Sequence, residues 1–276
     1  MTEHHVKTVY PVDAVRGQIT LPGDKSLSHR ALMFAAVAKG CSKIKHLNIG
    51  SDALSTIACL QKLGVHFQLG KFTVDVDSPG LYGWTQPLDG ILNCGNSGTT
   101  VRLLSGLLAG REKITVTMVG DASLSARPMK RIIEPLEKME ADICSDSGHL
   151  PMTIHGKKLK GIHYTLPVAS AQVKSCVLFA GLSAQGKTYV EEPLPTRDHT
   201  ETMMKMFHIP VFKNKNIISV HILRRAIPGF QYAVPGDPSS AAYWVAAGLL
   251  LPKSRLHLRN MSLNPTRIAF IKLLKA

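Results

Sequence analysis

Apolar residues recur at the three- and four-residue spacing of an amphipathic helix in eight segments of the chain. Several of these segments have a Ser, Thr or Asp in front and a glycine behind, which are common start and stop signals of helices. Gly40, Gly64 and Gly110 are expected to close three of them. The expected helices begin near Ser26, Asp52, Thr99, Pro128, Ser170, His199, Ser239 and Thr266.

The helix starts form two interleaved series, 26, 99, 170, 239 and 52, 128, 199, 266, and both advance by 67 to 76 residues. Between the helices lie stretches rich in β-branched residues, such as FTVDV, KITVTMV and KTYVEE, bounded by Pro and Gly. The pattern predicts an α/β fold of repeated βαβαββ units, each with a strand, a helix, a strand, a helix and two strands. Chance spacing of helices in an ordinary α/β protein is the alternative interpretation.

Three complete copies of this unit are expected to form one domain over residues 21–234. A fourth copy begins at residues 234–238, whose prolines and glycine are also typical of a hinge, and Ala276 ends its second helix. We therefore expect residues 235–276, together with residues 1–20, to form a second domain that is incomplete.

The composition, 45% hydrophobic and 19% charged residues, is that of a folded globular protein. The longest apolar run, residues 243–251, is shorter than the roughly 20 residues of a membrane span. The first thirteen residues contain no apolar stretch typical of a signal peptide, so a cytoplasmic location is expected. The five cysteines are odd in number and mostly within apolar runs, so we expect reduced core cysteines and neither disulfides nor metal ligands.

The formal net charge of +14 indicates anionic partners. A nucleic-acid surface would gather basic residues on one face together with aromatics, whereas aromatics are 6% here and the basic residues are dispersed. Small phosphorylated substrates fit the composition better. A basic surface that is merely well solvated is the remaining interpretation.

The starts of the expected helices carry polar and basic residues. A helix N-terminus attracts anions, so a cation there is unfavourable unless an anion binds. Lys25, Arg127 and Arg197 stand at such positions, and Lys174 lies in the first turn of the fifth helix. Capping side chains and solvated cations are the alternative explanation at any single site. Because a cation at the positive end of a helix recurs at several of these starts, the helix starts are the candidate binding site.

At these residues the sequence resembles the EPSP synthase family. The resemblance covers essentially the whole chain and rests on long motifs. Two departures are visible: Glu140 stands where the family normally has a glycine after a helix, and the chain ends earlier than the family does. The matching segments are LPGDKSLSHR (21–30), NCGNSGTTVR (93–102), GD (120–121), RPM (127–129), SAQVKS (170–175), RDHTE (197–201) and NPTR (264–267).

The resemblance implies the two-domain enolpyruvyl transferase fold, in which six βαβαββ copies are shared three and three and the N-terminal strand crosses into the second domain. It implies transfer of the enolpyruvyl group of phosphoenolpyruvate to the 5-hydroxyl of shikimate 3-phosphate. This reaction lies in the shikimate pathway to chorismate and aromatic amino acids. No cofactor and no metal are implied. We expect a monomer whose partners are the two small substrates, without a nucleic acid or membrane partner.

The resemblance also implies roles for individual residues. Lys25 would contact both substrates and act in catalysis. Lys25 and Arg127, 102 residues apart, are expected to meet in one anion cluster. Shikimate 3-phosphate would be held by Lys25, Ser26, Arg30, Ser170, Ala171, Gln172, Thr196, Arg197 and His199, and phosphoenolpyruvate by Lys25, Asn96, Gly98, Thr99, Arg127 and Gln172.

Two related functions compete with this one. The sister enolpyruvyl transferase of cell-wall synthesis has a reactive cysteine in a glycine-rich loop before its Arg-Pro pair, whereas Ser125-Ala126 precede Arg127-Pro128 here. A truncated, non-catalytic fragment that binds shikimate 3-phosphate is the second alternative. Two further copies, about 140 residues, would hold the family's other acid and base groups, so we expect a chain ending at Ala276 to be inactive by itself.

Overall fold

The eight expected helices are present in the computed structural model, which describes residue 8 and residues 10–275. Their starts lie within three residues of the predicted positions. The short helices α4 (Ala122–Ser125) and η1 (Leu81–Gly83) were not predicted, because one helical turn shows no periodicity. The eight are α1 (Lys25–Val37), α2 (Ser51–Lys62), α3 (Gly98–Ala109), α5 (Lys130–Lys138), α6 (Ala171–Gly181), α7 (His199–Met206), α8 (Pro238–Leu250) and α9 (Ala269–Lys275).

The chain divides into a large unit, Gly23–Val234, and a small unit formed by Met1–Pro22 and Pro235–Ala276. Leu21 and Pro22 thus lie with the small unit, two residues away from the predicted boundary. Among the described helices, none is long and apolar enough to cross a membrane.

The large unit contains three four-stranded sheets of identical topology, with strand orders β15-β2-β4-β3, β5-β6-β8-β7 and β10-β12-β14-β13. In each sheet the first pair is parallel and the other pairs are antiparallel, which confirms the repeated βαβαββ unit. Their strands are β2 (Lys39–Lys45), β3 (His66–Leu69), β4 (Thr73–Pro79), β5 (Ile91–Asn93), β6 (Thr115–Val119), β7 (Asp142–Asp146), β8 (His149–His155), β10 (His163–Thr165), β12 (Lys187–Glu191), β13 (Val211–Asn214), β14 (Ile217–His221) and β15 (Gln231–Ala233).

Two strands are exchanged between the units. β1 (Arg16–Thr20) precedes α1 in the sequence but pairs in parallel with β16 (Arg255–Arg259) of the small unit. The equivalent place beside β2 is taken by β15, which precedes α8 in the sequence. The crossing of the N-terminal strand is therefore confirmed. The first copy does not begin with a strand at residue 21, as the repeat had suggested, because Pro22 cannot donate to a ladder and Asp24 already caps α1.

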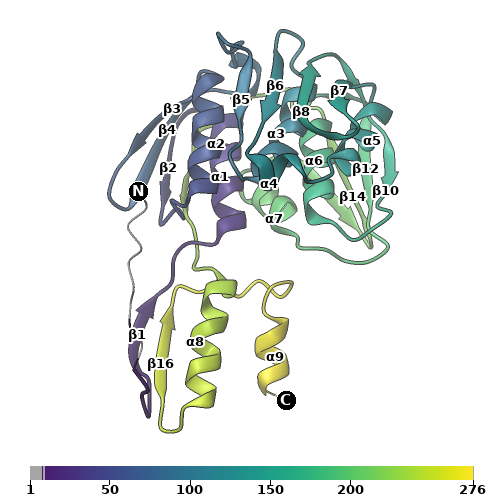
Figure 1. Cartoon of the computed structure of the whole chain (residues 1–276). Coiled ribbons are helices and arrows are strands. Elements are labelled where there is room, and N and C mark those ends of the chain that lie inside the picture. Colours follow the sequence, from purple (N-terminus) through teal and green to yellow (C-terminus); the bar gives the residue numbers. More distant parts are fainter. Residues whose placement is uncertain (1–7, 9, 276) are drawn as a thin grey trace. The chain divides into compact units, whose positions relative to one another are not determined.

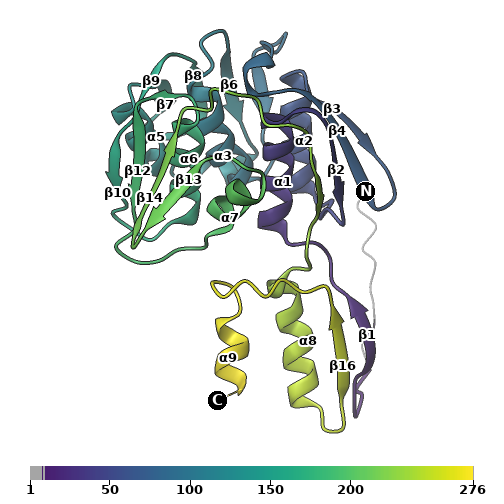
Figure 2. The ribbon, with the colours of Figure 1, turned by 180° about the vertical axis from the view of Figure 1, so that it is seen from behind.

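The first helix of each copy forms the interior of the large unit. Eleven residues of α1, eleven of α3 and nine of α6 are buried, whereas α5 buries only one apolar stripe. In Figures 1 and 2 the three sheets lie around the outside, with α1, α3 and α6 between them. Helices that are apolar all round require such an enclosed position, and the one-sided helices can cover the outside.

The contact between α3 and α6 is unusually close. A Cβ atom at Gly106 would lie 2.2 Å from the carbonyl oxygen of Cys176, so only glycine permits this approach. α3 and α6 therefore pack with their backbones nearly touching.

Several local expectations need correction. Gly40 lies inside β2 and does not end α1, because the strand begins at Lys39 directly after the helix cap Ala38. Pro128 lies two residues before α5 and is not its first residue. All five cysteines are free, but only Cys59, Cys94 and Cys176 are buried. Cys41 and Cys144 are exposed, because they occupy strand positions that point away from the core.

The second helix of each copy ends in the same way, with a residue of positive φ after the helix. The residue that follows donates its N–H to the carbonyl oxygen five residues back, as in a Schellman motif. Glycine occupies the positive-φ position in the first copy only. The three positions are Gly64 (φ 89°), Glu140 (φ 67°) and His208 (φ 57°), and the bonds are Val65 to Leu60 (3.1 Å), Ala141 to Leu136 (2.9 Å) and Ile209 to Met204 (2.8 Å).

Glu140→Gly is expected to stabilise the protein. A left-handed conformation costs a residue with a Cβ about 1–2 kcal/mol, and the exposed ion pair of Glu140 with Lys160 (2.7 Å) offsets little of this, so a net gain of about 0.5–1 kcal/mol is expected. Urea unfolding measures the change. Glu140→Ala is the matched control, because it removes the ion pair but keeps the strained backbone, and an equal gain in both variants would contradict the explanation.

Candidate active site

α1, α3 and α6 each begin with a side chain that caps the helix. Asp24 accepts a hydrogen bond from the N–H of Leu27 (2.9 Å), Ser97 accepts from that of Thr100 (3.2 Å), and Ser170 accepts from that of Val173 (3.4 Å). These caps explain why the helices begin where they do. Most residues predicted to bind substrate lie within or beside these first turns.

Gln172 ties the start of α6 to the start of α3. Arg102 Nη1 donates to Gln172 Oε1 (2.7 Å), and Gln172 Nε2 donates to Thr99 Oγ1 (3.1 Å). Two predicted site residues from different copies, Thr99 and Gln172, are therefore in direct contact. Arg102 was noted only as part of a motif in the sequence, and the structure adds it to the site.

Arg127 lies on the turn after α4, next to the start of α3. Its Nη2 donates to Asn96 Oδ1 (2.5 Å) and to Ser123 Oγ (3.2 Å). A Cβ atom at Gly98 would lie 3.4 Å from Arg127 Nη1 and 3.1 Å from Arg102 Nη1. A side chain at position 98 would therefore crowd both guanidinium groups, and the glycine keeps the two cations free to bind a small anion together.

The electrostatics around Arg102 favour an added negative charge. Its side chain is only 8% exposed, and its Nε is buried without a hydrogen-bond partner. Burial lowers the pKa of Arg102 from its ordinary value, and the positive charges of Arg131 and Arg127 lower it further. An anion at this position would relieve the repulsion among the three guanidinium groups.

Lys25 is linked to the same place through Asp52. Its ammonium forms an ion pair with the Asp52 carboxylate, in the first turn of α2. Thr100 Oγ1, in the first turn of α3, lies 3.5 Å from the backbone oxygen of Asp52, to which it can donate. These contacts link Lys25 to the start of α3, which Arg127 also contacts through Asn96, and the meeting of Lys25 and Arg127 in one anion cluster stays a prediction.

The Asp52 carboxylate weakens the case that Lys25 requires a bound anion. A cation at a helix start is unfavourable, but here a carboxylate neutralises it locally, so the conflict does not by itself require a bound anion. Sequence reasoning missed the pairing because an acidic residue in the first turn of α2 is a common stabilising feature of that helix.

Arg30 is buried and held by groups from three helices. Its Nε donates to Thr200 Oγ1 (2.7 Å), its Nη2 to Ser175 Oγ (2.7 Å) and its Nη1 to the carbonyl oxygen of Ser26 (3.0 Å). Burial lowers the pKa of Arg30 to about 10, against the raising effects of Glu201 and Asp24, and Arg197 lowers it further. Arg30 is therefore a rigidly oriented cation, and the positive charge of Arg197 acts on it.

Lys174 does not face the candidate site, although its place in the first turn of α6 had suggested so. The side chain is fully buried, and its Nζ lies 2.6 Å from Glu201 Oε1 and 3.0 Å from Glu192 Oε1. Glu192 also accepts from the N–H (3.2 Å) and the hydroxyl of Thr196. This buried ion group positions the loop between β12 and α7, which carries Thr196 and Arg197.

The remaining predicted residues lie at the start of α6 and in or beside the start of α7. Ser170 is the N-cap of α6, Ala171 is its first residue, and His199 is the first residue of α7 and is buried. The carbonyl oxygen of Ala171 accepts from Ser175 Oγ (2.6 Å), and Ser175 in turn holds Arg30. Thr196 donates to Glu192, which also pairs with Lys174 of α6.

Comparison with known proteins identifies the family of the chain. The model of the family EPSP synthase (3-phosphoshikimate 1-carboxyvinyltransferase) matches residues 9–276. The 3-phosphoshikimate 1-carboxyvinyltransferases of Bacillus velezensis and Bacillus subtilis are 46% and 44% identical over 266 residues, which is 96% of this chain and 61% of each relative. A solved EPSP synthase of Acinetobacter baumannii superimposes with a TM-score of 0.89 at 43% identity, over 95% of this chain and 59% of that one.

The repeated βαβαββ units and the polar, basic helix starts define the class of proteins with the enolpyruvyl transferase fold. Within that class, the chain belongs to the EPSP synthase family. The chain spans about three fifths of the length of the curated relatives that it matches.

The His29 side chain, between α1 and α2, predicts a pH dependence of stability. It is fully buried, with its Nδ1 2.7 Å from Thr56 Oγ1 and its Nε2 without a partner. Burial lowers the pKa of His29 from 6.5 to about 4, with Asp52 raising it and Lys25 and Arg30 lowering it.

Because the folded state disfavours the proton, the stabilisation is complete above pH 6.5 and is lost as the pH falls to about 4. The loss amounts to about 3 kcal/mol at 1.36 kcal/mol per pKa unit. The free energy of unfolding, measured across this range, should fall more steeply in the wild type than in His29→Asn. Parallel curves for the two proteins would contradict the assignment.

Proposed function

We propose that the chain serves the transfer of the enolpyruvyl group of phosphoenolpyruvate to the 5-hydroxyl of shikimate 3-phosphate, giving 5-enolpyruvylshikimate 3-phosphate and phosphate. The observation that supports this most directly is a group of three cations in and beside the first turns of α1 and α3. Arg30 and Arg102 donate to Ser175 and Gln172 of the third copy, and Arg127 donates to Asn96 just before α3. The names of the relatives point to the same substrates.

The large unit is the proposed shikimate 3-phosphate domain. Arg30 would bind this ligand from a fixed position, because three hydrogen bonds hold its guanidinium. Ser26, Ser170, Ala171 and Gln172 lie at the adjoining helix starts. The loop with Thr196, Arg197 and His199 would close the other side, since Glu192 anchors it to Lys174 in the core.

Phosphoenolpyruvate is assigned to the two guanidinium groups beside Gly98. These belong to Arg127 and Arg102, and Asn96, Thr99 and Gln172 supply hydrogen-bonding groups. Two guanidinium groups can bind a carboxylate or a phosphate bidentately. Gln172 contacts Arg102 and Thr99 of this subsite and directly follows Ala171 of the other, so it is placed to orient the two ligands relative to each other.

In the proposed reaction the 5-hydroxyl adds to C2 of phosphoenolpyruvate while C3 gains a proton, and phosphate then leaves. This chemistry requires neutralisation of two phosphates and a carboxylate, orientation of the reactants, and groups that move protons. The large unit supplies the first two. Lys25 is the proposed catalytic residue within these residues, since its flexible ammonium lies at the start of α1 beside Asp52.

Arg127→Ala is expected to weaken phosphoenolpyruvate binding by about 1.5–3 kcal/mol, the usual loss of a charge-assisted hydrogen bond, with little effect on folding. Calorimetric titration measures the affinity. Arg131→Ala is a matched control, because it removes a nearby exposed guanidinium that also acts electrostatically on Arg102. Equal losses in both variants would show a general field effect, and an unchanged affinity in Arg127→Ala would reject the assignment.

A polypeptide of these 276 residues alone is expected to bind shikimate 3-phosphate but not to turn over. Missing general acid or base groups each cost roughly 10²–10⁴-fold in rate. The assay is phosphate release from the two substrates, with intact mass confirming an end at Ala276. Turnover within about tenfold of a complete relative would show that the essential groups lie in this chain. Binding without turnover would support the alternative of a non-catalytic fragment for that polypeptide.

A further inference from the structure

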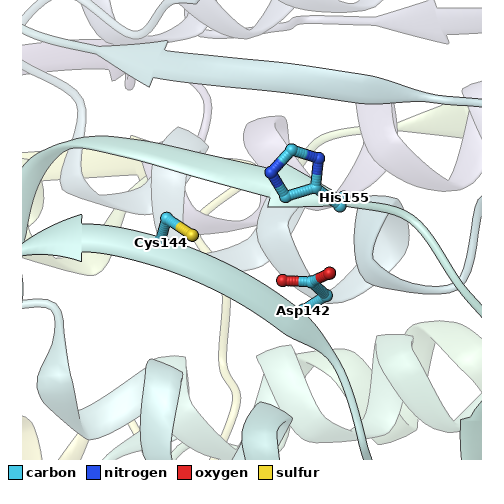
Figure 3. Close-up of side chains that lie close together, drawn as sticks. All are labelled: Asp142, Cys144 and His155. Atoms are coloured by element: carbon cyan, nitrogen blue, oxygen red, sulfur yellow. The ribbon is translucent and has the colours of Figure 1, made fainter.

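Three metal-ligand side chains meet on the outer face of the second sheet. Asp142 and Cys144 are two residues apart on β7 and point to the same side, and His155 lies directly opposite Asp142 on β8. Their ligand atoms all lie within 4.8 Å of one another, the one group of this kind in the part of the chain that the structure describes. Figure 3 shows the sulfur, the carboxylate and one ring nitrogen turned toward a common point.

We propose that Asp142, Cys144 and His155 bind a thiophilic divalent cation of the zinc type. Thiolate, imidazole and carboxylate are the ligands that zinc takes in proteins, and three of them leave a fourth tetrahedral position for water. Two of the three side chains are exposed, so small rotations from the present separations, all within 4.8 Å, would bring the ligand atoms to bonding distance. Magnesium and calcium are disfavoured, because they prefer sets of oxygen ligands.

The imidazole is oriented for this role. His155 Nδ1 lies 3.4 Å from Thr115 Oγ1 on β6, on the side of the ring away from Cys144. A proton on Nδ1 leaves the Nε2 lone pair directed at the other two ligands. Metal-bound histidines are commonly held in this way through their second nitrogen.

The cluster lies at the opposite end of the sheet from the candidate active site. β6 begins at Thr115, which pairs with His155, and ends at Val119, whose carbonyl oxygen accepts from Cys94 next to the start of α3. A bound cation would join the edge strand β7 to β8 without touching the helix starts. It is therefore a site for stability or metal sensing, separate from substrate binding.

The first copy of the repeat offers an internal control. Cys41, Asp77 and His66 form a row across β2, β4 and β3, with Asp77 opposite both others. The same residue types are present there, but within the described residues their ligand atoms do not come within the 4.8 Å that the Asp142 group shows. Both Cys41 and Cys144 are exposed, so their thiols can be compared in one molecule.

The first test measures alkylation of each cysteine in the reduced, chelator-treated wild type by peptide mass spectrometry, with and without Zn²⁺. A bound cation holds the thiolate, so Zn²⁺ should slow alkylation of Cys144 and leave that of Cys41 unchanged. Equal protection of the two thiols, or none at Cys144, would overturn the proposal. This test needs no variant and so does not depend on a substitution being tolerated.

The second test titrates the protein with Cd²⁺ and follows the thiolate-to-metal absorption band. One equivalent should bind per chain without a change in size, and Cys144→Ser should remove the band, whereas Cys41→Ser should keep it. Asp142→Asn should weaken binding about tenfold or more, the lower end of the loss seen when ligand support is disturbed. Asp146→Asn, on the same face of β7, is the matched control and should leave the affinity unchanged. A band that survives Cys144→Ser, or a cation shared between two chains, would refute the site.

Discussion

The candidate site depends on the close parallel packing of α3 against α6. Gly106 lets the two backbones approach at Cys176, and one turn earlier Arg102 donates to Gln172; seventy residues separate the members of each pair. That separation matches the repeat, so the two copies meet in register. Because parallel helices in register begin at the same level, their N-terminal turns form one surface. A larger residue at position 106 would separate the helices and remove this alignment.

Because the central helices are buried, their polar and charged residues need partners inside the large unit. Lys174 lies inside the large unit only because Glu192 and Glu201 both contact it, and removing the lysine would leave two buried carboxylates without compensation. Near Arg30 the two carboxylates of Glu201 and Asp24 partly offset the positive charge, whereas the charges acting on Arg102 are both positive. The positive charge is therefore less compensated at Arg102, beside Gly98, than at Arg30.

The three copies of the large unit have the same backbone conformation at equivalent positions, although the side chains there differ. Gly64, Glu140 and His208 occupy the same left-handed position, although only the first is suited to it. The exchange of β1 and β15 likewise preserves the parallel pair that opens each sheet. On the outer faces of the strands the first two copies both carry a Cys, an Asp and a His, but only the group around Cys144 brings its ligand atoms within 4.8 Å of one another among the described residues.

Helical periodicity and turn residues in the sequence determined the eight long helices, the repeat and the place of the candidate site at the helix starts, because these depend on residues near one another in the chain. The tertiary structure decided which side chains meet. Asp52 neutralises Lys25, Lys174 turns inward to Glu192, and β15 replaces an expected strand at residue 21. None of these has a local signal, since each is a contact between distant segments whose register only the packed helices and sheets set.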